Sequence, residues 1–422
     1  MSRAATKVMN IGVGGIAKLV VALVSGAITI ASAADRNSLD FFTGADQRLL
    51  AALQPVRSVW QPYEGAVLHA AFSPDGRFVL TASNDKKVRV WDTNRGRAVT
   101  TYEGHYGWVT YAVFSPDSRR VVSASWDRSA HLWDARTGET IHKFKKHSGH
   151  VVYVAFSPDS RQILTAGDDG TARVWDATGG NMLHVLGGHT NGVRHGSFSS
   201  DGRFVATASW DGTARLYDSS TGAFIRRFWR HGNALKRVIF TPDDERIVTV
   251  SWDNTARLWK TKTGEVVRTY EGHGNGVSDV ALSPDATRIL TASADSTARL
   301  WNLETGDTLQ VYEGHEKMLD HAEFSPDGMR VLTSSRDGTA RLWNTESGET
   351  LHVLEGHEDP VIYAAFSPDG TRVITAGADG TARIWNSDTG RQIEVIRHGE
   401  ESLARANVAF VVPSIGESVR SR

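Results

Sequence analysis

The chain has 422 residues, 40% hydrophobic and 23% charged, and this composition is typical of a folded globular protein. It contains no cysteine, which excludes disulfides, thiol catalysis and zinc sites with cysteine ligands. With 47 basic and 48 acidic residues the formal net charge is −1, so bulk charge provides no general attraction for nucleic acid or an anionic membrane.

The first 33 residues are typical of a secretory signal peptide. Residues 1–18 contain Arg3, Lys7 and Lys18 and no acidic residue, and an apolar run leads to Ala31-Ser32-Ala33, a small-x-small cleavage pattern. The uncharged run from Leu19 to Ala34 has 16 residues, whereas a membrane-spanning helix needs about 20. We therefore expect a periplasmic or secreted protein. A membrane anchor formed by residues 8–34 and a cytoplasmic location are the alternatives.

Cleavage after residue 33 would leave 44 basic and 48 acidic residues, a net charge of −4, so we expect no nucleic-acid partner. With the signal cleaved, we also expect no stable membrane span. A lead-in segment, 34–55, which could include a short helix, precedes the rest of the chain.

A single unit then recurs eight times with a constant spacing of 42 residues. The spacing is marked by Trp91, Trp133, Trp175, Tyr217, Trp259, Trp301, Trp343 and Trp385. Within each unit, short runs alternate apolar and polar residues, which predicts β-strands, and Ser-Pro-Asp-Gly segments such as 73–76 predict tight turns. No unit shows a sustained helical period, so an all-β fold is expected.

The Gly-His and Trp-Asp pairs at this spacing, as at Gly104-His105 and Trp133-Asp134, resemble the WD40-repeat family of β-propellers, in its bacterial type. The match covers about residues 56–396. The resemblance implies an eight-bladed propeller over 56–400, with four antiparallel strands per blade. Each repeat would supply the outer strand of one blade and the three inner strands of the next.

The resemblance also implies a stabilising tetrad of His, Ser or Thr, Asp and Trp in each blade. Four tetrads are complete in the sequence: His105, Ser125, Asp127, Trp133; His231, Ser251, Asp253, Trp259; His273, Ser293, Asp295, Trp301; and His315, Ser335, Asp337, Trp343. In the other four units one member differs, namely Tyr63 for His, Gly167 and Gly377 for Ser, and Tyr217 for Trp. We expect those four blades to be less rigid.

Two segments fit the outer-strand position that would close the ring, Val56–Trp60 and Arg391–Ile396. Closure by the N-terminal segment is the preferred interpretation, because it would cover the exposed edge of the last blade. The tail, 401–422, contains Asn407–Val411, which resembles the first strand of a truncated ninth repeat.

Ser, His and Asp recur together, as in a hydrolase triad, but eight near-copies of one constellation indicate architecture rather than an active site. We therefore assign no catalytic residue, metal ligand or cofactor. A periplasmic quinone-dependent dehydrogenase is the enzymatic alternative. Its repeats place a docking Trp shortly after a Thr-Gly pair, where this chain has residues such as Ile141 and Leu351.

Function in a repeat protein is expected where the units differ. Three positions near the tetrad vary, and in the WD40 family such positions form the partner-binding top face. Here they include Trp108, Trp126, Trp210, Trp252, Arg194, Lys236, Met318 and Arg336. Aromatic and arginine side chains dominate interaction hot spots.

We therefore predict a monomeric, non-catalytic scaffold that binds a protein or peptide carrying acidic groups in the cell envelope or outside the cell. In the alternative interpretation these tryptophans only wedge neighbouring blades together. A structural or adhesive role without a saturable partner is a further alternative.

Overall fold

The computed structural model describes residues 19–24, 27–32, 65–93, 97–398 and 404–405. The chain divides into two compact units, residues 1–61 and 62–422. In the first unit, β1 (Leu19–Val24) pairs antiparallel with β2 (Ala27–Ser32). The lead-in predicted at 34–55 lies outside the described residues. Among the residues that are described, no helix is long and apolar enough to cross a membrane.

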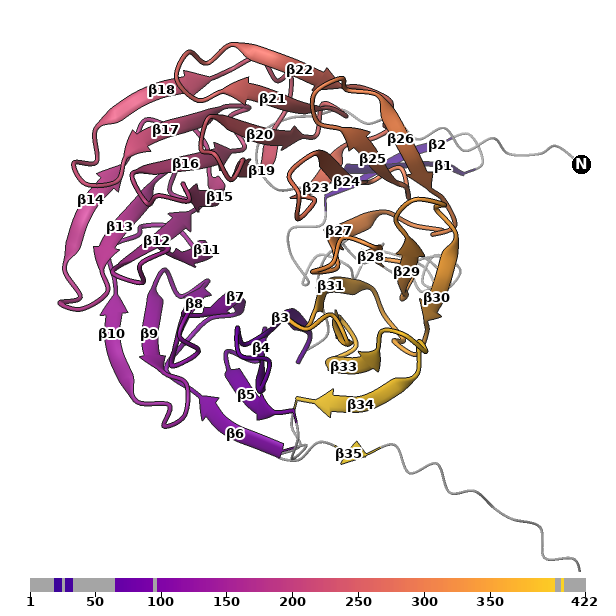
Figure 1. Cartoon of the computed structure of the whole chain (residues 1–422), viewed down its shortest axis with the longest axis horizontal. Helices are drawn as coiled ribbons and strands as arrows, with labels where there is room; N and C mark the ends of the chain where they lie inside the picture. Colours follow the sequence, from indigo (N-terminus) through magenta and orange to yellow (C-terminus); the bar gives the residue numbers. More distant parts are fainter. Residues whose placement is uncertain (1–18, 25–26, 33–64, 94–96, 399–403, 406–422) are drawn as a thin grey trace, which may run out of the picture. The chain divides into compact units, whose positions relative to one another are not determined.

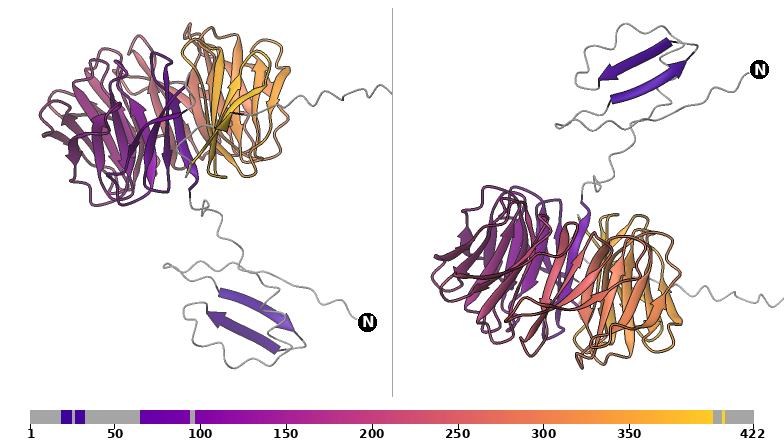
Figure 2. Two further views of the ribbon diagram at one scale, coloured as in Figure 1. Left: turned by 90° about the horizontal axis from the view of Figure 1, so that it is seen from below. Right: turned by 90° about the horizontal axis from the view of Figure 1, so that it is seen from above.

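The second unit is a ring of eight antiparallel sheets, which confirms the predicted eight-bladed propeller (Figure 1). Each sheet contains four consecutive strands, the eighth has a short fifth strand at its edge, and the first strand of each lines the centre of the ring. The edge-on views of Figure 2 show sheets of the propeller packed side by side.

The first four blades have these bounds: β3 (Val67–Phe72), β4 (Phe78–Ser83), β5 (Val88–Asp92), β6 (Arg97–Tyr102); β7 (Val109–Phe114), β8 (Arg120–Ser125), β9 (Ala130–Asp134), β10 (Thr140–Phe144); β11 (Val151–Phe156), β12 (Gln162–Gly167), β13 (Ala172–Asp176), β14 (Met182–Leu186); β15 (Val193–Phe198), β16 (Phe204–Ser209), β17 (Ala214–Asp218), β18 (Phe224–Phe228).

The last four are β19 (Leu235–Phe240), β20 (Arg246–Ser251), β21 (Ala256–Lys260), β22 (Val266–Tyr270); β23 (Val277–Leu282), β24 (Arg288–Ser293), β25 (Ala298–Asn302), β26 (Thr308–Tyr312); β27 (Leu319–Phe324), β28 (Arg330–Ser335), β29 (Ala340–Asn344), β30 (Thr350–Leu354); β31 (Val361–Phe366), β32 (Arg372–Gly377), β33 (Thr381–Asn386), β34 (Gln392–Arg397). A two-residue strand, β35 (Ala404–Arg405), adds to the edge of β34.

The hydrophobic core lies between blades rather than within them. Leu216 and Phe228 of the fourth blade, for example, pack with Leu235, Ile247 and Trp259 of the fifth. The seven tryptophans that mark the repeat are all at most 3% exposed, because each ends the third strand of its blade inside such a cluster. Burial of these large rings helps to hold neighbouring blades together.

The ring is closed by the C-terminal segment, so the preferred prediction of N-terminal closure was wrong. The outer strand of the eighth blade is β34, which pairs with β33, and Ile396 on β34 packs with Val67 and Trp91 of the first blade. In Figure 1, β34 ends beside the first blade. The rival segment, Val56–Trp60, and the predicted ninth-repeat strand, Asn407–Val411, lie outside the described residues.

One side chain from the first strand of every blade points to the centre, and together they form what we call the channel ring. Its members, in blade order, are His69, Tyr111, Tyr153, His195, Arg237, Asp279, His321 and Tyr363. From His321 through Tyr363, His69, Tyr111 and Tyr153 to His195, neighbouring ring centroids are 4.0 to 4.8 Å apart. Asp279 completes the circuit by pairing with Arg237 and, at 3.4 Å, with His321.

Candidate functional site

The tetrad is a chain of hydrogen bonds that links the loop before each blade to its second and third strands. In the fifth blade, His231 Nδ1 lies 2.8 Å from Asp253 Oδ2, and His231 Nε2 lies 2.8 Å from Thr249 Oγ1. The indole N–H of Trp259 donates to the same hydroxyl at 2.8 Å. The tetrad therefore fixes the turn that carries Asp253, and with it the residue just before Asp253.

The electrostatics of the tetrad fit a neutral imidazole beside a carboxylate. Burial raises the pKa of Asp253, but the hydrogen bond and charge of His231 and the bonds from Thr255 and Gly232 outweigh it and hold this pKa well below its usual range. Burial lowers the pKa of His231 by more than its bond to Asp253 raises it. An imidazole protonated on Nδ1 then donates to Asp253 and accepts from the Thr249 hydroxyl.

The predicted hydroxyl members were wrong by two residues. The hydroxyls that bond the tetrad histidines belong to Thr81, Ser123, Thr165, Thr207, Thr249, Thr291, Thr333 and Thr375. The predicted serines Ser125, Ser251, Ser293 and Ser335 instead donate to backbone carbonyls of the preceding loop, at 2.9 to 3.0 Å. Each also accepts the N–H of the tetrad aspartate, so it closes the tight turn.

Most of the tetrads that were expected to be incomplete are therefore complete. Gly167 and Gly377 occupy the turn-closing position, and the tetrads beside them keep Thr165 and Thr375. In the first blade, His398 supplies the imidazole missing at position 63, because its Nε2 lies 2.8 Å from Thr81 Oγ1 and its Nδ1 3.3 Å from Asp85 Oδ2.

The fourth blade alone departs from the tetrad pattern within the described residues. Tyr217 directs its hydroxyl to the carbonyl of Gly187, at 2.8 Å, rather than to Thr207.

These contacts also explain why the recurring Ser, His and Asp do not form a triad. Ser251 is fully buried and its hydroxyl donates to the carbonyl of Asn233, while Thr249, the hydroxyl beside His231, is fully buried as well. A nucleophile must reach a substrate carbonyl, and neither oxygen is exposed.

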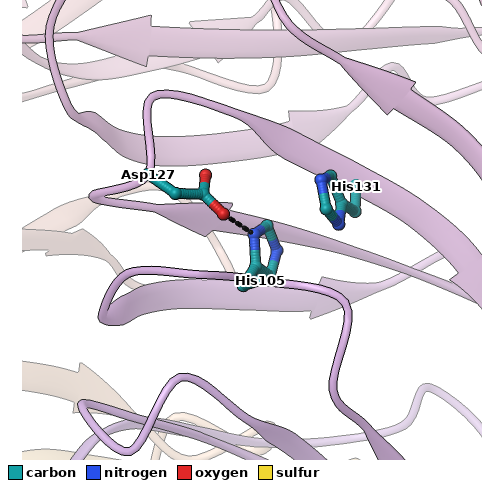
Figure 3. A group of neighbouring side chains, drawn as sticks. All are labelled: His105, Asp127 and His131. Atoms are coloured by element: carbon teal, nitrogen blue, oxygen red, sulfur yellow. Dashed lines mark hydrogen bonds and ion pairs between the residues drawn. The ribbon is translucent and has the colours of Figure 1, made fainter.

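The second blade contains a unique cluster, shown in Figure 3. In the described residues, His105, Asp127 and His131 are the one group of at least three His, Asp or Glu side chains close enough to share a metal ion. Their nitrogens are already engaged: His105 bonds Asp127 at 2.9 Å and Ser123 at 2.9 Å. His131 bonds Tyr102 at 2.7 Å and Ser129 at 3.0 Å, and the two imidazoles stack at 3.9 Å. The cluster therefore acts as a hydrogen-bond network.

The predicted tryptophans of the second to fifth blades gather on the face of the propeller that carries the tetrad turns. Trp108 stacks on Trp126 with centroids 4.4 Å apart, and Trp126 stacks on His150 of the next blade at 4.8 Å. His150 Nδ1 in turn lies 3.4 Å from Asp168 Oδ2.

The row continues into the fourth and fifth blades. Arg194 Nη1 lies 2.6 Å from Asp168 Oδ1, and the guanidinium lies over the ring of Trp210 at 4.2 Å. Lys236 lies over Trp252 at 5.8 Å. We call this row the aromatic strip: Trp108, Trp126, His150, Asp168, Arg194, Trp210, Lys236 and Trp252.

The strip is partly exposed. Trp126 is 38% exposed and Trp210 43% exposed, whereas Trp108 and Trp252 are half-buried. Trp252 leans on the backbone of the sixth blade, since a Cβ on Gly276 would lie 2.1 Å from its ring. The tryptophans thus both contact neighbouring blades and present ring surface to solvent.

β-Bulges place the two cations of the strip. The pairing of β15 with β16 skips Arg194, and that of β19 with β20 skips Lys236. A bulge inserts an unpaired residue and re-aims its side chain, and here both side chains turn over the tryptophan of their own blade. The alternation of residues along the strand predicted that the side chains of Arg194 and Lys236 point outward, but it did not predict the bulge.

Met318 and Arg336, which the sequence grouped with the strip, lie in the seventh blade and are separate from it. Met318 is half-buried. Arg336 is paired with Asp320 through two contacts of 2.9 and 3.1 Å, so its charge is balanced locally.

The channel ring was not identified from the sequence, although in the second to eighth blades its members lie six residues after the tetrad histidine and vary between units. Burial and the charges of His321 and Arg237 lower the pKa of His69 to about 3. Burial also lowers the pKa of His321, to about 4, against the opposing effect of Asp279.

Comparison with known proteins identifies the repeat. The family profile described as WD domain, G-beta repeat matches residues 54–92, 96–134, 138–176, 180–218, 222–260, 264–302, 306–344 and 348–386. Most matches contain the outer strand of one blade and three strands of the next, as expected; β34, which closes the ring, follows the last match.

Curated relatives match over about one repeat each. The Notchless protein homolog of Arabidopsis thaliana is 44% identical over 43 residues, which is 10% of this chain and 9% of that protein. WD repeat domain-containing protein 83 of Danio rerio is 40% identical over 42 residues, 10% of this chain and 13% of that protein. Ribosome assembly protein 4 of Saccharomyces cerevisiae is 40% identical over 40 residues, 10% of this chain and 8% of that protein.

Among solved structures, the computationally designed Ika8 protein superposes with a TM-score of 0.70 and 26% identity, covering 77% of this chain and 98% of that one. The repeat profile, the eight blades and the tetrads agree with one another. The chain is a member of the WD40 family of β-propellers.

Proposed function

We propose that this propeller is a non-catalytic scaffold that binds a protein or peptide through the aromatic strip of its second to fifth blades. The observation that carries the proposal is the row of stacked, partly exposed aromatic and cationic side chains on the tetrad-turn face. Trp and Arg residues contribute most to interaction hot spots, because they bury a large area for little loss of side-chain entropy.

The charges of the strip favour a partner with acidic groups. Arg194 is balanced by Asp168, but in the described part of the chain Lys236 forms no ion pair and lies beside the ring of Trp252. A carboxylate of a partner could therefore pair with Lys236 while apolar parts of the partner cover Trp210 and Trp252.

The relatives support a scaffold and no particular partner. The repeat is shared with proteins named for a WD repeat domain and for ribosome assembly. Each match covers only 8% to 13% of the relative, so it transfers the repeat and not that protein's partners.

The double variant Trp210→Ala, Trp252→Ala tests the proposal. Crosslinking in the native envelope followed by mass spectrometry first identifies partners of the wild-type protein. The double variant should then capture those partners at least ten-fold less in a pull-down, with little change in melting temperature. Trp229→Ala is the matched control, because Trp229 is 59% exposed but lies outside the strip. Unchanged capture with a lowered melting temperature would show that the tryptophans only brace the blades.

The cellular location is a separate part of the proposal, and it rests on the basic, apolar and small-residue pattern of residues 1–33. Fractionation of the native host and N-terminal sequencing of the purified protein test it. A mature chain that begins at Ala34 in the periplasm or medium would support the location, whereas intact Met1 on a soluble cytosolic protein would contradict it.

A further inference from the structure

The second blade differs from the other seven blades in the residue at one position of its third strand. Seven blades have arginine there, namely Arg89, Arg173, Arg215, Arg257, Arg299, Arg341 and Arg383, whereas the second blade has His131. In three of these blades the arginine lies close to the tetrad aspartate: Arg89 lies 2.8 Å from Asp85, Arg173 3.6 Å from Asp169, and Arg257 3.8 Å from Asp253. His131 instead stacks on His105, so no guanidinium reaches Asp127 from this strand.

A recess of about 450 Å³ opens beside His131 on the tetrad-turn face. It is lined by the turn after β8 and by the loops before β7 and after β10, through Tyr106, Asp127, Arg128, Ser129, His131, Lys145, Lys146 and His147. Recesses of this size accommodate a side chain or small ligand.

The rim of the recess is strongly cationic. Arg128, Lys145 and Lys146 are exposed, and in the described part of the chain none of them forms an ion pair. The loops at the corresponding place in the fifth, sixth and seventh blades have Glu-Gly, at Glu271-Gly272, Glu313-Gly314 and Glu355-Gly356. The two lysines therefore replace an acidic residue and a glycine in a chain that is acidic overall once residues 1–33 are removed.

The lining contains one acidic side chain, Asp127, against the three cations Arg128, Lys145 and Lys146. Both carboxylate oxygens of Asp127 are engaged, Oδ2 by His105 and the N–H of Tyr106, and Oδ1 by the N–H of Ser129.

Arg128 also adopts an unfavourable backbone conformation. Its φ is +70°, and the turn is left-handed in the other blades too, with Gly170, Gly212, Gly338 and Gly380 in four of them and Lys86, Asn254 and Ser296 in three. A left-handed conformation is disfavoured for residues with a Cβ, so glycine is the less strained choice at this position.

We propose that this recess binds an anionic group of a peptide partner, a phosphate monoester or paired carboxylates, through Arg128, Lys145 and Lys146. The inference deepens the proposed function and rests on it for the identity of the ligand as a peptide. The same two loops carry both sites: Tyr106 and Trp108 lie in one, and Trp126 and Arg128 in the other. A peptide seated on Trp108 and Trp126 would thus present its acidic group to the recess.

Small probes test the recess without the partner. Saturation-transfer NMR with N-acetyl-phosphoserine amide and with an N-acetyl diglutamate amide measures binding to the full-length protein, with N-acetyl-serine amide as the uncharged control. We expect the wild-type protein to bind at least one charged probe and not the control. Binding of phosphoserine alone assigns a phosphopeptide, and binding of both assigns acidic peptides in general.

Two variants make the second blade resemble the other blades and should fold. Arg128→Gly and the pair Lys145→Glu with Lys146→Gly should each weaken binding of the charged probe at least ten-fold, because each removes positive charge from the rim. Arg128→Gly should also raise the melting temperature, because it relieves the left-handed arginine. Arg119→Glu, in an exposed Ser-Pro-Asp turn, is the control and should bind as wild type.

Unchanged probe binding in Arg128→Gly and in the double-lysine variant would overturn the inference. So would capture by phosphatidylglycerol vesicles without binding of either soluble probe, since it would indicate a membrane surface rather than a recess. The pull-down with Trp210→Ala, Trp252→Ala can fail while the probe still binds, so the two proposals are tested separately.

Discussion

His398 Nε2 lies 2.8 Å from the Thr81 hydroxyl, although the two residues are 317 positions apart in the chain. This contact joins the end of the eighth blade to the first. All eight blades are made of consecutive strands, so among the described residues no strand is exchanged between the first and the eighth blade. The eighth blade is instead joined to the first by the tetrad that includes His398 and by the hydrophobic cluster that includes Ile396, Val67 and Trp91.

Replacing His398 with alanine should therefore destabilise the closure. The variant leaves the buried Thr81 hydroxyl and the Trp91 indole, which donates to it at 3.0 Å, without the imidazole. We expect a loss of about 1 to 3 kcal/mol in the free energy of unfolding by urea. The matched variant His315→Ala removes the same contacts inside the ring.

Hydrogen exchange distinguishes the two variants. His398→Ala should increase exchange in β3, β4 and β34, whereas His315→Ala should affect the sixth and seventh blades. Equal exchange at the closure in both proteins would contradict a special role for His398.

The sequence alone could not decide how the ring closes, because Val56–Trp60 and Arg391–Ile396 both have the pattern of an outer strand. The hydroxyl member of the tetrad was also ambiguous. Thr249 and Ser251 lie two residues apart on β20 and so point to the same side of the strand. Only the distances to His231 and to the backbone of Asn233 separate their roles.

Other features were predictable because they depend on spacing or on burial. The constant spacing of 42 residues determined the number of blades, and the tryptophans on it lie in the core.

Two features of the candidate sites could not be predicted. The direction of Arg194 over Trp210 depends on a bulge in β15, and the alternation of apolar and polar residues does not reveal this bulge. The recess is lined by His131 at a position where seven blades have arginine, a difference that becomes meaningful only once the neighbouring loops are placed.

The roles of the two hydroxyls lead to a second prediction. Thr249→Val keeps the shape of the side chain but removes the partner of both His231 and Trp259, so it should cost about 2 to 3 kcal/mol in urea unfolding. Ser251→Ala should cost less, about 1 kcal/mol, because Gly167 and Gly377 occupy this position in complete tetrads. A larger loss of unfolding free energy in Ser251→Ala than in Thr249→Val would show that the serine hydroxyl contributes more to the tetrad than the threonine hydroxyl.

The channel ring predicts that stability falls in mild acid. His321 has a folded pKa of about 4, below the value of about 6.5 for an unfolded chain. Its stabilising contribution is therefore present above pH 6.5 and is lost as pH falls towards 4, because the unfolded state takes up the proton first. The loss for His321 alone is on the order of 3 kcal/mol, and His69 adds to it in the same direction.

Urea unfolding at pH 7.5, 6 and 5 measures this effect. His321→Gln should flatten the dependence between pH 6.5 and 4, because glutamine does not titrate. His142→Gln is the control for the substitution itself, since His142 is half-buried on the outer strand β10 and does not belong to the channel ring. A wild-type protein with constant stability down to pH 5 would contradict neutral, buried histidines in the ring.

The close contact between Trp252 and Gly276 provides a test of the aromatic strip in which no strip residue is substituted. A Cβ at Gly276 would lie 2.1 Å from the Trp252 ring, so Gly276→Ala should push the indole away from the sixth blade and change its position relative to Lys236. Gly232→Ala is the matched control, because the nearest atom to its added Cβ is Asp253 Cβ at 3.9 Å. Partner capture should fall several-fold in Gly276→Ala and remain unchanged in Gly232→Ala, with both proteins within a few degrees of the wild-type melting temperature. Equal capture by the two variants would show that the seat of Trp252 does not matter for binding.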